Sequence, residues 1–444
     1  DKDPAEAWGK DNFYGYHLTM RNLGRVRTLT AGRYILQFGQ GVTLWTGFEP
    51  FSLTGGSPVR YASGVRAASA FNESGWQDGL AATIDIGRGF EATAFVSRTD
   101  GEWFGGGHLS YRRNNLVCGI TATATKLDDS LQLRDYVYNQ DYFRGDRQAS
   151  LGGDVLWQVG QALFFGEVAT DRELRLAAIG GVRLSLGDNS FGVSLRHYDP
   201  SYHNLHAAAY SIGETRNEQG VTFDARLRLP LGINALVSVD LHRFPSLRYG
   251  SYAPSSGSWA RVQLGRAFGR HAEVSLRYAW RQKQRNLPGS DSTVYLAEEA
   301  VRQQAQAQLK LTYGPWHLTT RAIAAWFDGD KTSRQRGGLV AQEVRYTQGP
   351  WQTALQAALF DVDGYYARLY LSESNLQYSY GIPSMQNRGV RAVVVARYDI
   401  NRGLNISVKY AVSVYADVDG IGTGDARTEG NHRQTWHLLL RWKF

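Results

Sequence analysis

The chain has 444 residues, of which 43% are hydrophobic, 12% are aromatic and one is a cysteine, and its formal net charge is +8. A single cysteine excludes a disulfide framework, and this content of aromatic and apolar residues excludes a disordered chain. Apolar runs such as residues 392–396 are too short for a helix that crosses a bilayer. Lys and Arg total 49, and because only eight are lysine, 41 are arginine.

The element that repeats along the chain is a strand in which apolar and polar residues alternate. Alternation with a period of two gives each strand one apolar and one polar face. The pattern predicts about 21 strands, at residues 13–22, 25–37, 79–87, 89–98, 104–112, 115–126, 147–159, 161–170, 174–187, 190–199, 220–229, 232–243, 258–267, 270–282, 300–313, 316–327, 337–347, 351–362, 387–399, 403–415 and 432–444.

The predicted connections are short at one end of the strands and long at the other. Short turns fall at 187–189, 230–232, 268–270, 314–315, 349–350 and 401–403, and long polar connections at 127–146, 200–218, 244–254, 283–299, 364–385 and 416–431. This asymmetry, with aromatic residues beside the short turns, is typical of an outer-membrane β-barrel. A large soluble array of β-sandwiches is the alternative, because its strands would also alternate.

The strand count predicts the fold class: an all-β chain that forms a transmembrane antiparallel β-barrel over residues 1–444. The first and last predicted strands run in the same direction and cannot pair antiparallel. We therefore expect a barrel of about 22 strands whose first strand is missing from this chain. The expected location is the bacterial outer membrane, in contact with its lipids, with long loops outside the cell and short turns in the periplasm.

Residues 39–78 form a long connection that is too apolar and too rich in glycine for a freely solvated loop. Barrels of this size are normally plugged, so we expect the connection to fold into the lumen or to cap it. A loop packed over the rim is the alternative. The candidate plug residues are Phe38, Gly39, Gln40, Gly41, Leu44, Trp45, Phe48 and Phe51.

The polar faces of the predicted strands carry more bases than acids. The inward bases are Arg175, Arg183, Arg196, Arg226, Arg228, Arg277, Arg281, Arg302, Lys310, Arg391, Arg397, Lys409, Arg441 and Lys443. The inward acids are Asp154, Glu167, Asp224, Asp240 and Glu273. An excess of bases predicts a lumen that attracts anions, and arginine suits carboxylate and phosphate because it binds them with two hydrogen bonds. Ion pairs that only fill the lumen are the alternative.

Signatures of enzymes and of metal sites are missing from the sequence. Acidic pairs at 328–330, 361–363 and 417–419 lack the glutamate that completes an EF-hand calcium loop, so solvated turns are the better interpretation. The histidines are scattered, and only His203 and His206 have a spacing that resembles a metal site. We expect no metal, no cofactor and no enzymatic activity; a barrel hydrolase with its catalytic residues at the outer rim is the alternative. The terminal Phe444 resembles the signal read by the outer-membrane assembly machinery, and a core aromatic is the alternative.

A resemblance to a known family covers roughly residues 1–48. It is carried by Asp1–Trp8, by Phe13–Leu18, and by Ala31–Gly41 with Leu44 and Trp45. These segments resemble Bacteroidota outer-membrane β-barrel proteins that have an N-terminal helix-hairpin-helix domain. This chain departs from the family pattern at two places: Arg33 replaces the usual acidic residue, and Val42 follows Gly41 before Leu44. The resemblance implies an upstream periplasmic module, outside this sequence, that binds the nucleic-acid backbone.

Three functions follow as hypotheses. The first is an outer-membrane channel or translocation barrel with a basic lumen, in its specific version for uptake of a polyanion such as DNA. The second is a structural or accessory subunit of a larger complex, with other outer-membrane proteins as partners. The third is a passive porin that prefers anions. Nucleic acid is an expected partner only through the upstream module that the resemblance implies.

Overall fold

The computed structural model describes residues 16–47, 58–68, 75–99, 101–287, 297–377, 379, 381–422 and 427–443. In these residues the chain is built of strands, with three 3-10 turns at Val137–Asn139, Pro230–Gly232 and Tyr365–Ala367. The described residues contain no helix long and apolar enough to span a bilayer. Phe48, Phe51, Phe444 and the first part of the family resemblance, residues 1–15, lie outside the described residues.

The predicted all-β antiparallel fold is confirmed. The large sheet contains 22 described strands, and each of the 21 strands predicted from the alternation has a counterpart within a few residues. The additional strand is the short β3. The strands are β1 (His17–Leu23), β2 (Val26–Gln37), β3 (Gly64–Ala67), β4 (Gln77–Gly87), β5 (Phe90–Thr99), β6 (Glu102–Arg113), β7 (Leu116–Leu131), β8 (Gly145–Val159), β9 (Ala162–Asp171), β10 (Leu176–Leu186), β11 (Asn189–Tyr198), β12 (Glu218–Leu229), β13 (Ile233–Phe244), β14 (Ser255–Phe268), β15 (Ala272–Asn286), β16 (Ala297–Tyr313), β17 (Trp316–Gly329), β18 (Gln335–Gln348), β19 (Trp351–Val362), β22 (Asn387–Asp399), β23 (Leu404–Tyr415) and β26 (His432–Trp442).

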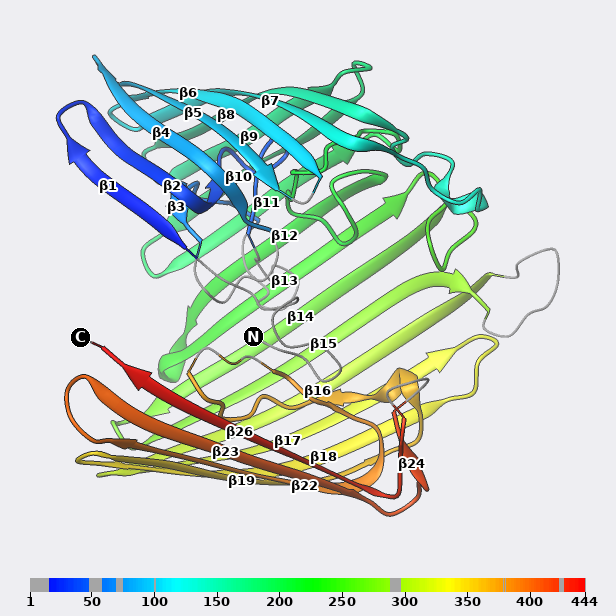
Figure 1. Cartoon of the computed structure of the whole chain (residues 1–444). Coiled ribbons are helices and arrows are strands. Elements are labelled where there is room, and N and C mark those ends of the chain that lie inside the picture. The colour runs from blue at the N-terminus through cyan, green and yellow to red at the C-terminus, as the bar shows by residue number, and fades with distance from the viewer. Residues whose placement is uncertain are drawn as a thin grey trace. The chain divides into compact units, whose positions relative to one another are not determined.

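The chain divides into two compact units, which we describe separately. Unit 1 comprises residues 1–226 and 238–258, and unit 2 comprises residues 227–237 and 259–444. In unit 1, strands that follow one another in the sequence pair antiparallel from β4 to β12, and β2 pairs with both β3 and β4. In unit 2 the same neighbour pairing runs from β15 to β19 and on through β22, β23 and β26 (Figure 1).

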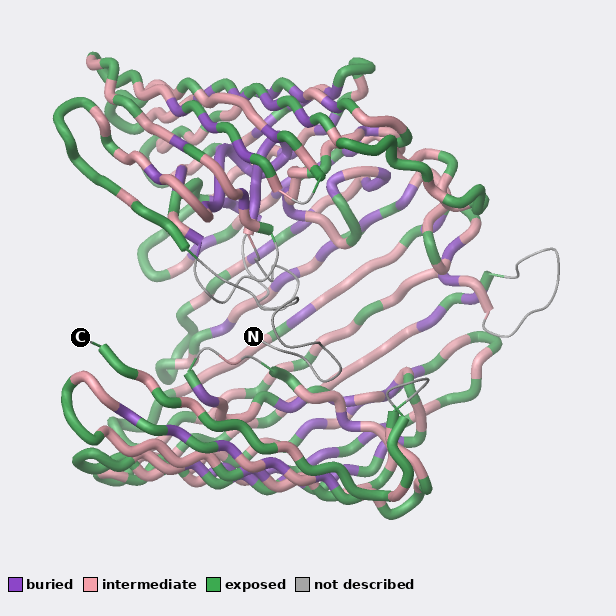
Figure 2. Tube along the Cα trace, in the orientation of Figure 1, coloured by how far each residue is buried: buried purple, intermediate pink, exposed green. Residues whose placement is uncertain are grey.

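Burial alternates along the strands in the opposite sense to a soluble sheet. In β9, Glu167 and Ala169 are buried while Val168 between them is 53% exposed. In β19, Phe360 is buried while Leu359 is 62% exposed, and the tube in Figure 2 shows this alternation along most strands. We call the side that carries the exposed apolar residues the apolar face, and the opposite side the polar face. A continuous exposed apolar face is a surface that needs a partner or a membrane.

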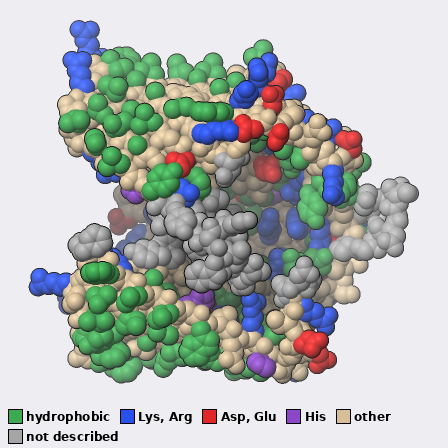
Figure 3. All heavy atoms as spheres, in the orientation of Figure 1, with side chains coloured by type: hydrophobic (Ala, Val, Ile, Leu, Met, Phe, Trp, Pro, Cys, Tyr) green, Lys and Arg blue, Asp and Glu red, His purple; other side chains and the backbone are tan. Residues whose placement is uncertain are grey.

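On the side that Figure 3 shows, hydrophobic side chains gather over β4–β6 in unit 1 and over β23 and β26 in unit 2. In β26 the side chains of Trp436, Leu438, Leu440 and Trp442 are 65% to 73% exposed. Beside the short turns, Trp316 packs against Tyr346 at 4.7 Å and Trp351 against Tyr398 at 4.5 Å. Each pair joins directly opposed residues of neighbouring strands. These aromatic pairs form the belt that the sequence predicts beside the short turns.

Several connections that the sequence assigned to long polar loops are partly structured. β7 continues to Leu131 and β15 to Asn286, so two of the predicted loops are shorter than expected. Residues 416–431 contain a small hairpin of β24 (Gly420–Ile421) and β25 (Thr428–Glu429). Residues 364–385 contain a 3-10 turn, β20 (Leu369–Tyr370) and β21 (Ser384–Met385), and they fold back onto the sheet. The sequence did not reveal this return, because the apolar residues of this connection follow no regular alternation that would mark a strand or its partner.

Candidate functional site

The predicted inward bases lie on the polar face, at its ends or in its connections. Arg175 belongs to the turn between β9 and β10, and Lys443 follows β26, while the other twelve lie in strands. Several of these bases are paired with carboxylates, as expected if ion pairs only fill the lumen. The paired ones are Arg175 with Asp171 and Glu173, Arg196 with Glu218 and Asp240, Lys310 with Glu273, Arg397 with Asp399, and both Arg391 and Lys409 with Glu373.

Other bases have neutral partners or none within the described part of the chain. Arg183 donates to Ser190 and Arg277 to Gln263. Arg281 stands directly opposite Arg302 in the pairing of β15 with β16, so two bases occupy opposed positions on the polar face. Like charges that face each other across a strand pair repel, and this repulsion favours a bound anion.

Arg196 illustrates a base that is committed to structure. Its side chain is 1% exposed, its Nε donates to Glu218 Oε1 at 2.6 Å, and its Nη1 and Nη2 donate to the two oxygens of Asp240 at 2.8 and 2.9 Å. Thr222 accepts a further bond from Nη1. A buried guanidinium with its donors used in this way tethers β11, β12 and β13, and it offers nothing to a ligand.

The described part of the candidate plug is a tight hairpin, residues 38–45, that packs on the polar face of unit 1. The N–H of Phe38 donates to Leu44 O and that of Gly41 to Phe38 O. Gly39 and Gly41 have φ values of +56° and +84°, which L-residues with side chains rarely adopt. A Cβ at Gly39 would lie 2.5 Å from Glu167 Oε2, so the hairpin approaches the sheet too closely for any side chain there.

A single carboxylate of the sheet holds this hairpin. Glu167 of β9 accepts N–H bonds from Gln40 and Val42 at Oε2 (2.5 and 3.1 Å) and from Thr43 at Oε1 (2.7 Å). Three backbone donors aimed at one carboxylate make a nest for negative charge. Alternation in the sequence predicts Glu167 on the polar face but not its role, because the donors lie more than 120 residues away in the sequence.

The connection between β11 and β12 covers the other side of hairpin 38–45. Tyr202 Oη donates to Val42 O at 3.0 Å, Asn204 Nδ2 donates to Thr43 O at 2.7 Å, and the N–H of Ala208 donates to Gly41 O at 2.9 Å. The hairpin therefore lies between the sheet and residues 202–208, and its residues from Phe38 to Trp45 are all buried. The described residues of the candidate plug are brought together here, while Phe48 and Phe51 lie outside the description.

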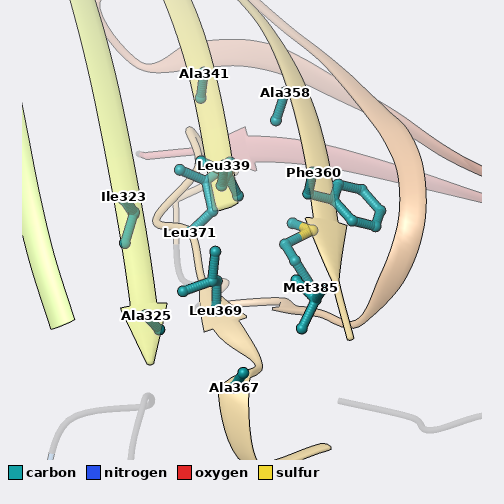
Figure 4. Packing of buried hydrophobic residues seen from close by; sticks show 11 residues of the cluster. Ile323, Ala325, Leu339, Ala341, Ala358, Phe360, Ala367, Leu369, Leu371 and Met385 are labelled. Carbon is teal, nitrogen blue, oxygen red and sulfur yellow. The ribbon is translucent and has the colours of Figure 1, made fainter. Parts of the chain in front are cut away.

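Unit 2 has a different cover on its polar face, which we call the return segment, residues 363–377. Ala367, Leu369 and Leu371 of this segment and Met385 beyond it are almost completely buried. They belong to one apolar cluster, and Figure 4 shows Leu369, Leu371 and Met385 reaching toward Leu339 of β18 and Phe360 of β19. Burying the side chains of Leu369, Leu371 and Met385 contributes on the order of 5 kcal/mol. Apolar contacts thus anchor the first half of the return segment to the sheet.

Basic residues of the sheet hold the backbone of the return segment. Arg302 donates to Tyr366 O at 3.2 Å and to Arg368 O at 2.8 Å. Arg321 donates to Ser372 O at 2.9 Å. Carbonyl oxygens offer a guanidinium partial negative charge only, so these contacts satisfy its hydrogen bonds without neutralising it.

The one carboxylate that the return segment lays on this face is Glu373. Arg391 of β22 donates to its two oxygens at 2.8 and 3.0 Å, and Lys409 of β23 donates to Oε1 at 2.7 Å. The side chain of Glu373 is 3% exposed. Burial alone would raise the pKa of Glu373, but the hydrogen bonds and charges of Arg391 and Lys409 hold it below its usual range. Alternation predicts both bases on the polar face but not their partner, because Glu373 lies in a connection that the sequence assigns to a long polar loop.

The best metal-like group in the described residues is Asp171, Glu173 and His203, whose ligand atoms lie within 4.8 Å of one another. Arg175 enters the same group, with its Nη1 2.8 Å from His203 Nδ1 and 3.9 Å from Asp171 Oδ2. A guanidinium in this position repels a cation, so we assign no metal to the group. His206 bonds to Glu102 at 2.7 Å rather than joining His203.

The acidic pairs at the long-loop end accept bonds from the protein itself. The carboxylate of Asp330 accepts a hydrogen bond from the backbone N–H of Glu299. In the same way, Asp363 accepts a bond from the N–H of Arg336, and Asp417 accepts one from the N–H of Arg388. These bonds continue the strand ladders into the loops, as expected for acidic turn residues. The absence of enzymatic activity remains a prediction.

Comparison with known proteins gives no family. No family model and no curated protein matches the chain. Among solved structures, the chain is similar to an anion-selective porin from Comamonas acidovorans, with 12% identity and a TM-score of 0.35 over 68% of this chain and 93% of the porin. It is also similar to the outer membrane protein OmpT of Vibrio cholerae (12% identity, TM-score 0.33, 77% of this chain and 99% of that one). A third similar structure is OccK5 (OpdH) of Pseudomonas aeruginosa, with 10% identity and a TM-score of 0.33 over 80% of this chain and 97% of that one. At these TM-scores the likenesses carry no structural or functional argument.

Proposed function

We propose that this chain is an outer-membrane β-barrel channel that favours anions. The observation that carries the proposal is the inverted sheet: apolar side chains such as Trp436 and Leu438 are exposed, while charged groups such as Glu167 and Arg196 are buried on the opposite face. A soluble protein buries its apolar face, whereas a membrane barrel turns it toward lipid. The aromatic pairs beside the short turns match the positions of side chains at a membrane surface.

The preference for anions rests on the bases that the chain does not neutralise. Arg281 and Arg226 make no hydrogen bond or ion pair with the described residues, and Arg302 is bonded only to neutral oxygens. Positive groups on the polar face of a barrel raise the local concentration of anions. Small anions are the proposed cargo, because hairpin 38–45 and the return segment already cover parts of the polar face. Uptake of DNA and an accessory role in a larger complex stay hypotheses, the former resting on the family resemblance.

The test is conductance of the purified chain in planar lipid bilayers with a KCl gradient. We expect ion-conducting events whose reversal potential shows a preference for chloride. Replacement of Arg281 by Gln should reduce that preference, because it removes a charge that no carboxylate offsets. Arg88→Gln is the matched control, since Arg88 sits in the two-residue turn between β4 and β5 and leaves the polar face unchanged. Selectivity for potassium, or membranes that stay silent, would overturn the proposal.

A further inference from the structure

We propose that Arg391 and Lys409 form a binding site for a carboxylate group of a soluble organic anion, and that Glu373 occupies this site in the structure. The inference rests on the proposed function for the route by which such an anion arrives. The return segment would then be an internal ligand that an external polycarboxylate displaces.

The site is built for a carboxylate. Arg391 presents Nε and Nη2 to the two oxygens of Glu373, in the fork arrangement that guanidinium and carboxylate groups share. Lys409 adds a third charged bond, and its side chain is only 6% exposed. Nη1 of Arg391 donates to Ser413 Oγ at 2.9 Å, and this bond fixes the orientation of the guanidinium. Two cations so close together, and largely removed from water, strongly favour an anion between them.

The charge around the return segment is unbalanced. The basic side chains of the sheet that donate hydrogen bonds to residues 366–375 are Arg302, Arg321, Arg345, Arg391 and Lys409. Arg285, which is paired with Glu298, stacks on the ring of Tyr366. The carboxylates that the hydrogen bonds include are Glu373 and Glu343, the latter bonded to Arg345 and Ser374. A ligand with two or three carboxylates would neutralise this surface more fully than Glu373 does, so it has an electrostatic advantage over the internal occupant.

The part of the return segment that would have to move is separable from its anchor. Residues 367–371 are held by the apolar cluster around Leu339 and Phe360. Residues 372–375 are held by polar contacts: Ser372 O with Arg321 and Gln356, Ser374 with Arg345 and Glu343, and Asn375 with Lys409. An anion that takes over Arg391 and Lys409 therefore leaves the anchor intact.

The experiment measures citrate binding to the detergent-solubilised full chain by isothermal titration calorimetry. Glu373→Ala vacates the site, and we expect it to bind citrate roughly tenfold or more tightly than the unsubstituted chain, since the internal competitor is gone. Glu373→Gln keeps the shape of the side chain and removes its charge, and it should also gain affinity. The double variant Glu373→Ala with Arg391→Gln should lose the gain, because the fork that binds the carboxylate is missing.

The matched control is Glu273→Ala, which removes an ion-paired carboxylate of the same face at Lys310, away from the return segment. It should bind citrate as the unsubstituted chain does. Equal affinity in the unsubstituted chain and in both single variants at Glu373, with folding verified by their thermal unfolding, would overturn the inference. Inorganic phosphate that binds the Glu373→Ala variant as tightly as citrate would overturn the assignment to carboxylates.

Failure of this inference is distinguishable from failure of the proposed channel. Binding is measured in detergent and needs no conduction. A chain that conducts anions but gains no citrate affinity on losing Glu373 contradicts the site alone. A chain that binds citrate in the variants but stays silent in bilayers contradicts the channel alone.

Discussion

Hairpin 38–45 in unit 1 and the return segment in unit 2 both cover the polar face of the sheet, but with opposite arrangements of charge. In unit 1 the sheet supplies the carboxylate of Glu167 and the hairpin supplies neutral N–H groups. In unit 2 the sheet supplies Arg391 and Lys409, and the cover supplies the carboxylate of Glu373. A dissolved anion cannot replace backbone N–H donors around Glu167, but it can replace Glu373. The comparison indicates a fixed cover in unit 1 and an exchangeable one in unit 2.

The strongest way to break this comparison is to remove the carboxylate of unit 1. Glu167→Ala leaves three buried N–H groups without their acceptor, at a cost of about 3–5 kcal/mol. We expect a clear fall in the midpoint of thermal unfolding in detergent and new protease cleavage within residues 38–45. Glu91→Ala is the control, because the side chain of Glu91 is 43% exposed and its ion pair with Arg27 is long, at 3.6 Å. Unchanged protection of the hairpin in Glu167→Ala would show that Glu167 does not hold it.

A glycine pair sharpens the same point with a smaller effect. Gly39 and Gly187 have φ values of +56° and +60°, but a Cβ would meet Glu167 only at Gly39 and nothing within 4 Å at Gly187. Both Ala variants carry the backbone strain, and Gly39→Ala adds a clash with the buried carboxylate. We expect the free energy of unfolding of Gly39→Ala, measured with denaturant, to be lower than that of Gly187→Ala by about 1–3 kcal/mol. Equal losses of stability in the two variants would mean that hairpin 38–45 accommodates the added Cβ without a clash.

The smallest expected effect is a dependence on pH in unit 2. The groups that face Glu373 are Arg391 and Lys409, with Asn375 beside them and the Arg345–Glu343 pair reached through Ser374. Because the pKa of Glu373 is depressed, its stabilising contribution is present above the pKa of a free glutamate, about 4.3, and is lost as pH falls through the lower folded value.

The corresponding measurement is the difference in unfolding midpoint between the unsubstituted chain and Glu373→Gln. We expect a difference at pH 6 that shrinks below about pH 4, as Glu373 takes up its proton. Other carboxylates titrate in both proteins and cancel in the comparison. A difference that stays constant down to pH 3 would mean that the charge of Glu373 does not hold residues 372–375.

The sequence was sufficient for the strands because their signal is local. Alternation such as Val168 between Glu167 and Ala169 marks both the strand and its faces, while Arg175, in the turn before β10, and Lys443, after β26, lie outside the described strands. Glycines at 39 and 41 marked the hairpin as unusual for a loop. The return segment was missed because its buried residues, Leu369 and Leu371 with Met385 farther on, lie in or next to short strands without a long alternating pattern, and nothing local directs them to the sheet.

Local alternation was enough for the all-β class, the positions of the strands and the face on which charged residues within strands lie, because a period of two needs only neighbouring residues. Which charges meet depends on the folded chain. Glu167 finds its donors 124 to 127 residues away, and Arg391 and Lys409 find Glu373 in a connection that no local pattern directs back to the sheet. Ion pairs depend on the path of the loops and the register of the strands, and these are set by the packing of the folded chain.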